Sequence, residues 1–154
     1  MFLEIKYKNN IVSGQFLTPL QTSVQPNVSL SGLDINKKYT LIMYDPNSIF
    51  GNHIHWIVSN IKGNDFYSGK SIFVYSGPTP PKGSGIHNYT FSLYKMNEET
   101  HISINSNNRN IPLHKLLEEL NIKGNPIITI KFTSKFQSKE KGRRTRRRTR
   151  RRNF

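Results

Sequence analysis

The sequence contains no cysteine and no alanine, and only nine of its 154 residues are acidic. The absence of cysteine excludes a disulfide framework, a thiol nucleophile and a zinc site with cysteine ligands. No apolar run approaches the roughly 20 residues that a membrane-spanning helix needs. The first six residues do not resemble a signal peptide, because Glu4 and Lys6 interrupt the apolar stretch. The default expectation is therefore a soluble cytoplasmic protein.

Positive charge is abundant, but it is concentrated at one end. The formal net charge is +14, and residues 139–154, with two lysines, eight arginines and one glutamate, supply +9 of it, which leaves +5 on residues 1–138. Because these like charges repel and almost nothing apolar accompanies them, we expect one domain over residues 1–138 followed by a disordered basic tail. The tail can neutralise nucleic-acid phosphates without reading sequence, can serve as a nuclear localisation signal, or is merely solvated. Its arginines are Arg143, Arg144, Arg146, Arg147, Arg148, Arg150, Arg151 and Arg152.

Short apolar runs separated by turn residues predict a mainly β domain. The expected strands are residues 1–7, 39–44, 53–61, 71–75, 89–95, 101–104 and 126–132. Turns are expected at Pro46-Asn47, at residues 62–64 and in the proline- and glycine-rich stretch 78–85. One helix is expected over residues 112–121, because four leucines (113, 116, 117 and 120) fall at helical spacing. We expect this late helix and the strand after it to pack onto a sheet formed earlier in the chain.

Two histidines stand out in the strand expected over residues 53–61. Alternation along a strand places His53, His55 and Ile57 on one face and Ile54, Trp56 and Val58 on the other, with the two histidines about 7 Å apart. The conservative interpretation is a solvent-facing histidine beside a hydrogen-bonded core histidine.

Two further segments carry polar groups that could form part of a functional site. Asp45 ends the strand expected over residues 39–44 and precedes a proline, a position that is usually only turn chemistry. The loop over residues 76–89 is rich in glycine and proline, and it delivers His87 to the start of a strand with Tyr89 on the same face. Glycines in such a loop adopt positive φ or bring backbone N–H groups toward a ligand.

These three segments resemble the motifs of the phosphatidylethanolamine-binding proteins, a family that includes the Raf kinase inhibitor protein and plant flowering regulators. The matching residues are 45–49 (DPNSI), 55–58 (HWIV) and 77–89 (GPTPPKGSGIHNY), in family order and spacing. The resemblance extends from about residue 25 to residue 136. Within the family, the sequence resembles members encoded by large DNA viruses. It implies a β-sandwich with a large central sheet and one late helix.

The resemblance also implies a small anion pocket and a binding or regulatory role without catalysis or cofactor. The implied site residues are Asp45, His55, Gly77, Pro78, His87 and Tyr89. Both histidines and the Tyr89 hydroxyl are expected to donate to phosphate oxygens of a lipid head group or a phosphorylated residue. Asp45 is expected either to fix the tautomer of a histidine or to accept from the ammonium of phosphoethanolamine, and we favour the first role. A protein partner such as a kinase is a further expectation.

Three positions depart from the family pattern. Asn47 stands where the family has an acidic residue, Ile49 where it has proline, and Asn88 where it usually has arginine. The change at Asn47 removes a negative charge from the pocket mouth, and the change at Asn88 removes an expected ion pair. Anion binding is therefore a firmer expectation than selectivity for phosphatidylethanolamine. By the same comparison, we expect the arginine-rich segment to stand in place of the C-terminal helix of animal members.

Two other site chemistries compete with anion binding. The pair His53 and His55 could hold a metal ion with Asp45 and His87, although no downstream Glu or His keeps the spacing that cupin-like sites use. A hydrolase is the second alternative, because the Gly83-Ser84-Gly85 stretch offers an exposed serine. The chain lacks the G-x-S-x-G elbow, and its sequence identifies no nucleophile–base pair.

Overall fold

The computed structural model describes residues 1–97 and 107–138. The strand expected over residues 101–104 and the basic segment 139–154, with its arginines, lie outside the described residues. The observed elements are β1 (Phe2–Tyr7), β2 (Asn10–Ile11), β3 (Asn27–Ser31), β4 (Lys38–Ser48), β5 (Gly51–Lys62), the 3-10 helix η1 (Phe66–Ser68), β6 (Lys70–Phe73), β7 (His87–Lys95), α1 (Leu113–Glu119) and β8 (Ile128–Ser134).

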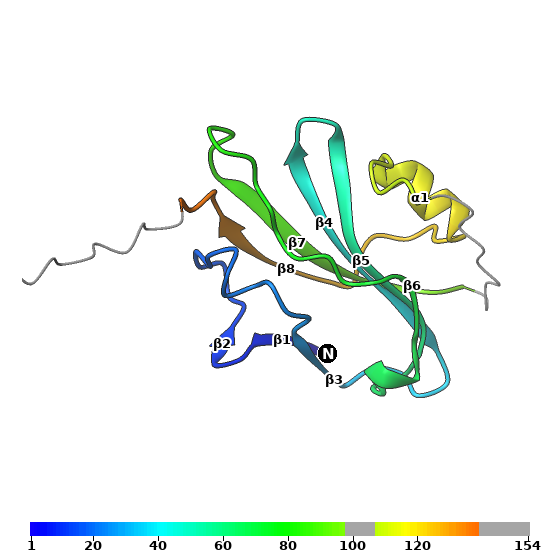
Figure 1. Cartoon of the computed structure of the whole chain (residues 1–154). Coiled ribbons are helices and arrows are strands. Elements are labelled where there is room, and N and C mark those ends of the chain that lie inside the picture. Colours follow the sequence, from blue (N-terminus) through cyan, green and yellow to red (C-terminus); the bar gives the residue numbers. More distant parts are fainter. Residues whose placement is uncertain (98–106, 139–154) are drawn as a thin grey trace, which may run out of the picture.

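Two antiparallel sheets and one helix form three layers (Figure 1). The larger sheet has the strand order β6-β5-β4-β7-β8, and the smaller sheet has the order β2-β1-β3. The small sheet covers one face of the large sheet, and α1 covers the other face. The mainly β fold with a large central sheet and one late helix is thus confirmed.

Each face of the large sheet buries its own apolar cluster. Between the sheets, Ile5 of β1 and Val28 of β3 meet Met43, Trp56 and other side chains of the central strands. On the opposite face, the leucine stripe of α1 packs on Ile42, Ile54, Ile57 and Tyr94. The central strands β4, β5 and β7 are buried on both faces, so their sequences read as nearly continuous apolar runs. These strands are the rigid base on which polar side chains at their ends are held.

Most expected elements are present, with shifted ends. The expected turn at Pro46-Asn47 is wrong, because β4 continues through both residues to Ser48. The chain turns instead at residues 49–50, and Ser48 then pairs with Gly51, which has a φ of 88°. The ladder is irregular between Asp45 and Ser48, and this irregularity accommodates the proline inside the strand. Strands β2 and β3 were not expected from the sequence.

The late helix and strand pack as expected. Leu116 and Leu120 are buried against the large sheet, while Pro112 stands immediately before the first helical residue. β8 joins the edge of the sheet beside β7, and the segment 14–17 hydrogen-bonds along the outer side of β8. Within the described residues, no helix has the length and apolar character needed to cross a membrane.

Candidate functional site

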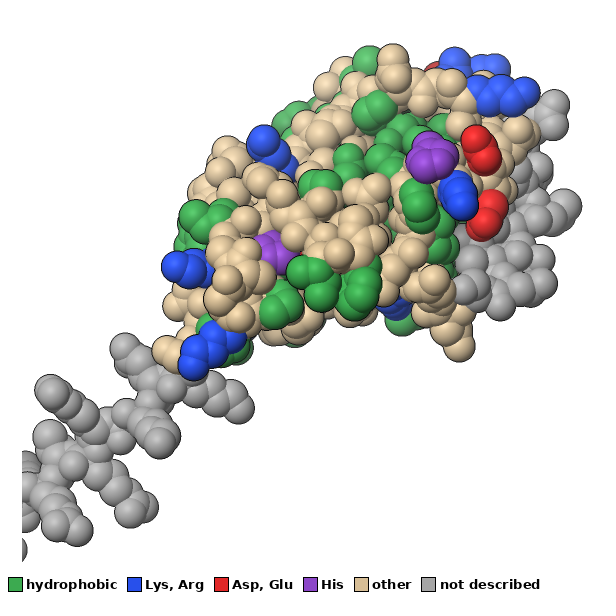
Figure 2. Space-filling model, turned by 90° about the horizontal axis from the view of Figure 1, so that it is seen from above, with side chains coloured by type: hydrophobic (Ala, Val, Ile, Leu, Met, Phe, Trp, Pro, Cys, Tyr) green, Lys and Arg blue, Asp and Glu red, His purple; other side chains and the backbone are tan. Residues whose placement is uncertain are grey.

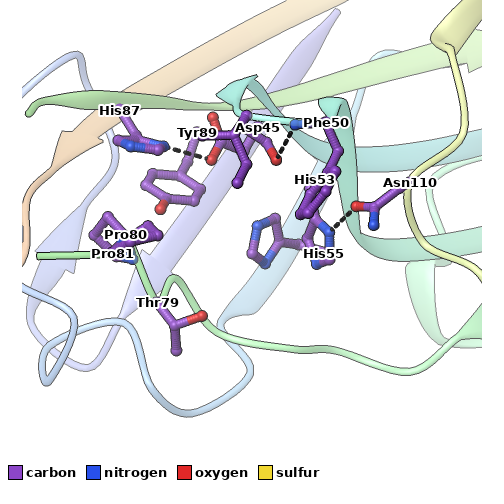
Figure 3. Close-up of a pocket in the computed structure, with 12 residues that line it drawn as sticks. Asp45, Phe50, His53, His55, Thr79, Pro80, Pro81, His87, Tyr89 and Asn110 are labelled. Atoms are coloured by element: carbon purple, nitrogen blue, oxygen red, sulfur yellow. Dashed lines mark hydrogen bonds and ion pairs between the residues drawn. The ribbon is translucent and has the colours of Figure 1, made fainter. Parts of the chain in front are cut away.

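A cavity of about 260 Å³ opens where β4, β5 and β7 meet the loop that precedes β7 (Figure 3). Its walls come from the β4–β5 hairpin, the start of β5, the loop before β7 and the segment before α1. The lining residues are Asp45, Ser48, Ile49, Phe50, His53, His55, Thr79, Pro80, Pro81, His87, Tyr89 and Asn110. No lysine or arginine is among them, and Asp45 is the one acidic member.

Four of the six residues implied by the sequence, Asp45, His55, His87 and Tyr89, line this cavity together. The other two, at positions 77 and 78, do not. Gly77 instead passes close to the segment 22–23: a Cβ at this position would lie 3.0 Å from the carbonyl oxygen of Thr22. A side chain at position 77 would therefore crowd this backbone, and the loop contacts the cavity through residues 79–81.

His55 sits on a β-bulge. The neighbouring pairs, Met43 with Trp56 and Tyr44 with Ile54, leave His55 without a partner in β4. A bulge of this kind breaks the alternation of side chains along the strand. Ile54 therefore packs on the α1 side and Trp56 on the small-sheet side, so the prediction that these two share a face is wrong.

The bulge brings the two histidine rings into contact. The ring centroids of His53 and His55 lie 4.8 Å apart in an edge-on arrangement, and the Tyr89 ring lies 5.2 Å from His55. His53 was noted in the sequence, but the resemblance did not place it in the site. Asn110, from the segment before α1, was missed because no local pattern marks it; Nδ1 of His53 donates to its Oδ1 at 2.7 Å.

His55 is held as a neutral ring. Only 3% of the residue is exposed, and Nδ1–H donates to the carbonyl oxygen of Ser76 at 2.6 Å. The pKa of His55 is lowered from 6.5 to about 4, chiefly by burial and to a smaller extent by the nearby His53 and Arg109, while the Ser76 bond and Asp45 act in the opposite direction. A neutral ring that donates through Nδ1 leaves Nε2 as a hydrogen-bond acceptor.

Arg109 braces the bulged strand from behind. Its guanidinium donates to the carbonyl oxygens of Ile54, His55 and Val74 at 3.1, 3.0 and 2.9 Å. The carbonyl oxygen of Arg109 also accepts from the N–H of Ile54 at 2.8 Å. The guanidinium lies 5.2 Å from the ring centre of Phe73. Arg109 therefore satisfies backbone groups at the start of β5, where β6 no longer pairs with that strand.

Both carboxylate oxygens of Asp45 are engaged in hydrogen bonds, one of them with His87. Oδ2 accepts from Nδ1–H of His87 at 2.7 Å, and Oδ1 accepts from the backbone N–H of Asn47 at 2.8 Å. Of the two roles considered for Asp45, this geometry matches the first, in which the carboxylate fixes the tautomer of a histidine.

Ser84 extends this pair into a chain that sequence reasoning missed. Its Oγ lies 2.8 Å from Nε2 of His87, so Ser84, His87 and Asp45 are connected in the order of a Ser-His-Asp triad. The same Oγ lies 2.7 Å from the carbonyl oxygen of Pro81. A hydroxyl has a single proton, so it serves either Pro81 or His87. In both cases neither ring nitrogen of His87 is left for a ligand.

Tyr89 presents a hydroxyl with no partner among the described residues. The residue is buried, yet its hydroxyl oxygen is not among the enclosed polar atoms that lack a partner, so it reaches the cavity. Its ring stacks on Phe132, with centroids 5.3 Å apart, which fixes the direction of the hydroxyl. Burial and the charge of Asp45 raise the pKa of Tyr89, so the group remains a donor.

A metal site finds no support in this geometry. Within residues 1–97 and 107–138, no three His, Asp or Glu side chains are grouped to hold a metal ion. Asp45 and His87 are poorly placed to bind a metal ion, because their polar atoms already form hydrogen bonds with each other, with Asn47 and with Ser84.

The sequence profile of the family described as "Phosphatidylethanolamine-binding protein" matches residues 7–132. The chain belongs to the phosphatidylethanolamine-binding protein family. Protein SELF-PRUNING of Solanum lycopersicum is 30% identical over 139 residues, which cover 84% of this chain and 78% of that protein. The 26 kDa secreted antigen of Toxocara canis is 34% identical over 101 residues, which cover 60% of this chain and 38% of the antigen.

A solved structure shows the same fold at low identity. Carboxypeptidase Y inhibitor, determined in complex with its cognate proteinase, superposes with a TM-score of 0.72 at 20% identity, covering 88% of this chain and 83% of the inhibitor. The chain spans half or less of the length of two curated relatives that it matches.

Two departures from the phosphatidylethanolamine-binding family pattern contact each other. Oδ1 of Asn47 accepts from the backbone N–H of Asn88 at 2.8 Å and from its side-chain amide at 3.1 Å. The acidic residue and the arginine of the family pattern are thus replaced by two amides, which tie the β4–β5 hairpin to the start of β7 without charge. The third departure, Ile49, is 77% exposed at the hairpin tip, beside Phe50 at 68%.

Proposed function

We propose that this chain is a binding protein without catalytic activity, and that its cavity takes a phosphate group carried on a lipid head group or on a phosphorylated side chain. The observation that carries this proposal is the convergence of unused polar atoms at the cavity. The Tyr89 hydroxyl and Nε2 of His53 and of His55 have no hydrogen-bond partner among the described residues. The atoms of Asp45, in contrast, are already engaged.

The cavity is a reasonable size for such a group. A volume of about 260 Å³ admits a tetrahedral anion with a short substituent, and the opening is not blocked by a charged side chain. Figure 2 shows a histidine side chain within a depression whose surroundings are mostly uncharged, with the lysines and arginines farther out. Hydrogen bonds, more than a cationic patch, would therefore select the ligand.

Catalysis is disfavoured by the position of Ser84. A nucleophilic serine directs its proton to the base, whereas here the carbonyl of Pro81, at 2.7 Å, competes for it. That carbonyl also accepts from the backbone N–H of Ser84 at 3.1 Å, so the serine is held by its own turn. With the hydroxyl proton on the Pro81 side, Ser84 directs no proton to Nε2 of His87, so the pair is not arranged for transfer of the serine proton.

Titration calorimetry with O-phosphoethanolamine tests the proposed site. Replacing Tyr89 by phenylalanine removes one hydroxyl donor to a charged oxygen, which is worth about 1.5–3 kcal/mol, so binding should weaken about 10- to 100-fold. The matched control is Tyr67→Phe, because Tyr67 is exposed and lies away from the cavity. Equal affinity of the two variants, or no binding at millimolar ligand, would contradict the proposal.

Several expectations from the sequence stay predictions: a viral source, a protein partner such as a kinase, a cytoplasmic or nuclear location, and nucleic-acid association through the eight arginines. The charge of residues 139–154 permits a direct test of the last one. Truncation after Ser138 should remove most retention on heparin at low salt. Unchanged retention would assign the charge contact to residues 1–138.

A further inference from the structure

The histidines His53 and His55 present acceptors to the cavity, which is unusual for an anion site. Nδ1–H of His53 donates to Asn110, and Nδ1–H of His55 donates to the carbonyl oxygen of Ser76. Each ring therefore turns a lone pair on Nε2 toward the cavity. The Tyr89 hydroxyl is one available donor. A fully deprotonated oxygen placed against either Nε2 would meet a lone pair, so one proton has to enter with the ligand or from solvent.

The protein opposes protonation of His55 itself. The charged and titratable groups around its ring come from every neighbouring element: His53 on β5, Asp45 on β4, Tyr89 on β7 and Arg109 before α1. Asp45 favours the charged ring, but its carboxylate is already paired with His87. Burial, His53 and Arg109 all oppose the charge.

We propose that this cavity prefers phosphate monoesters to phosphodiesters, because only a monoester brings a P–OH proton that it can donate to Nε2 of His55. The preference rests on the proposed function and specifies its ligand class. A phosphorylated side chain, phosphoethanolamine or inorganic phosphate would satisfy it. A phospholipid head group is a diester and would not satisfy it at neutral pH.

The expected preference follows from two proton equilibria. The second pKa of a phosphate monoester is about 6, so about a tenth of the ligand carries the proton at pH 7. For a diester the proton must be taken up by His55, whose pKa of about 4 leaves about one ring in a thousand protonated at pH 7. With the other contacts equal, the monoester binds about 100-fold more tightly at pH 7 and about 10-fold more tightly at pH 5.

Inorganic phosphate and sulfate form the cleanest pair of probes, because they have the same shape and only phosphate carries a proton near neutral pH. Calorimetry on the full chain at pH 7 should detect phosphate binding and at least 50-fold weaker sulfate binding. O-phosphoethanolamine and glycerophosphoethanolamine provide the ester pair. In two buffers with different ionisation enthalpies at pH 5, the diester should take up about one proton and the monoester close to none.

The variant His55→Gln distinguishes the effect of protonating residue 55 from the effect of its hydrogen bond to the ligand. A glutamine amide can donate to Ser76 and still present an oxygen acceptor, but it cannot be protonated. It should keep the preference for phosphate over sulfate and lose the gain in diester affinity between pH 7 and pH 5. The matched control is His114→Gln, an exposed histidine on α1 that does not line the cavity.

The outcomes are distinguishable. Phosphate and sulfate binding within threefold of each other at pH 7, without proton uptake, would overturn the monoester preference and leave the proposed function standing. Tighter binding of vesicles containing phosphatidylethanolamine than of O-phosphoethanolamine at pH 7 would also overturn it. Failure of every phosphate compound to bind would remove the proposed function as well. The comparison of phosphate with sulfate uses the unmodified chain, so its result does not depend on whether any variant folds.

Discussion

Removal of the Arg109 side chain should destabilise the strand that carries His55. The guanidinium makes three bonds to backbone carbonyls, of which those to Ile54 and His55 are partly buried. Hydrogen bonds to a charged group contribute about 1.5–3 kcal/mol each, so the loss of the two partly buried bonds in Arg109→Met should lower the free energy of unfolding by about 3 kcal/mol. For a domain of this size, that corresponds to a fall in Tm of about 10 °C.

Urea unfolding of three variants tests this reasoning. Arg109→Lys keeps the charge but cannot fork to several carbonyls, so its loss of stability should be intermediate. Lys115→Met on the exposed side of α1 is the control for loss of a surface cation, and it should lie within 0.5 kcal/mol of the unmodified protein, the usual order for a surface change. Equal stability of the Arg109→Met and Lys115→Met variants would refute the bracing role.

Three further predictions follow from the site. His55 has a pKa of about 4 in the folded chain and 6.5 in the unfolded chain, so the unfolded chain binds an extra proton between these pH values. The free energy of unfolding should therefore fall by about 3 kcal/mol from pH 7 to pH 4. The same dependence of the unfolding free energy on pH in the His55→Gln variant would contradict this. Asn47→Ala should lose about 1 kcal/mol because both bonds to Asn88 disappear, whereas Asn47→Asp keeps an acceptor; equal melting of the two would argue against the amide pair. A fluorophosphonate probe should leave Ser84 unlabelled by intact mass, and stoichiometric labelling would assign it a catalytic role.

The sequence was informative about the strands because the central ones are buried on both faces. Apolar runs at residues 39–44, 53–61 and 89–95 marked β4, β5 and β7, and leucine spacing marked α1. β3 was harder to find, because Val28 and Leu30 alone carry its alternation. The end of β4 was misjudged, since Asp-Pro-Asn is typical of a turn and pairing with β5 keeps it extended.

The candidate site was predicted in part, and the errors have a common origin. Residues that the family motifs mark, such as Asp45, His87 and Tyr89, do meet at one cavity. The bulge at His55 depends on register with β4, and Asn110 reaches the cavity from 57 positions away from its partner His53. Pairing between distant segments leaves no local periodicity, so neither feature could be read from one strand alone.

The most direct test of phosphate binding in the cavity is a titration of the full chain with inorganic phosphate, followed by the ring nitrogen signals of its histidines in NMR. Nε2 of His55 should shift in a saturable manner, because it becomes the acceptor of the phosphate proton, while the exposed His114 should remain unchanged. Unchanged His55 signals at about 10 mM phosphate, or parallel shifts of His55 and His114, would contradict the assignment of this cavity as the binding site.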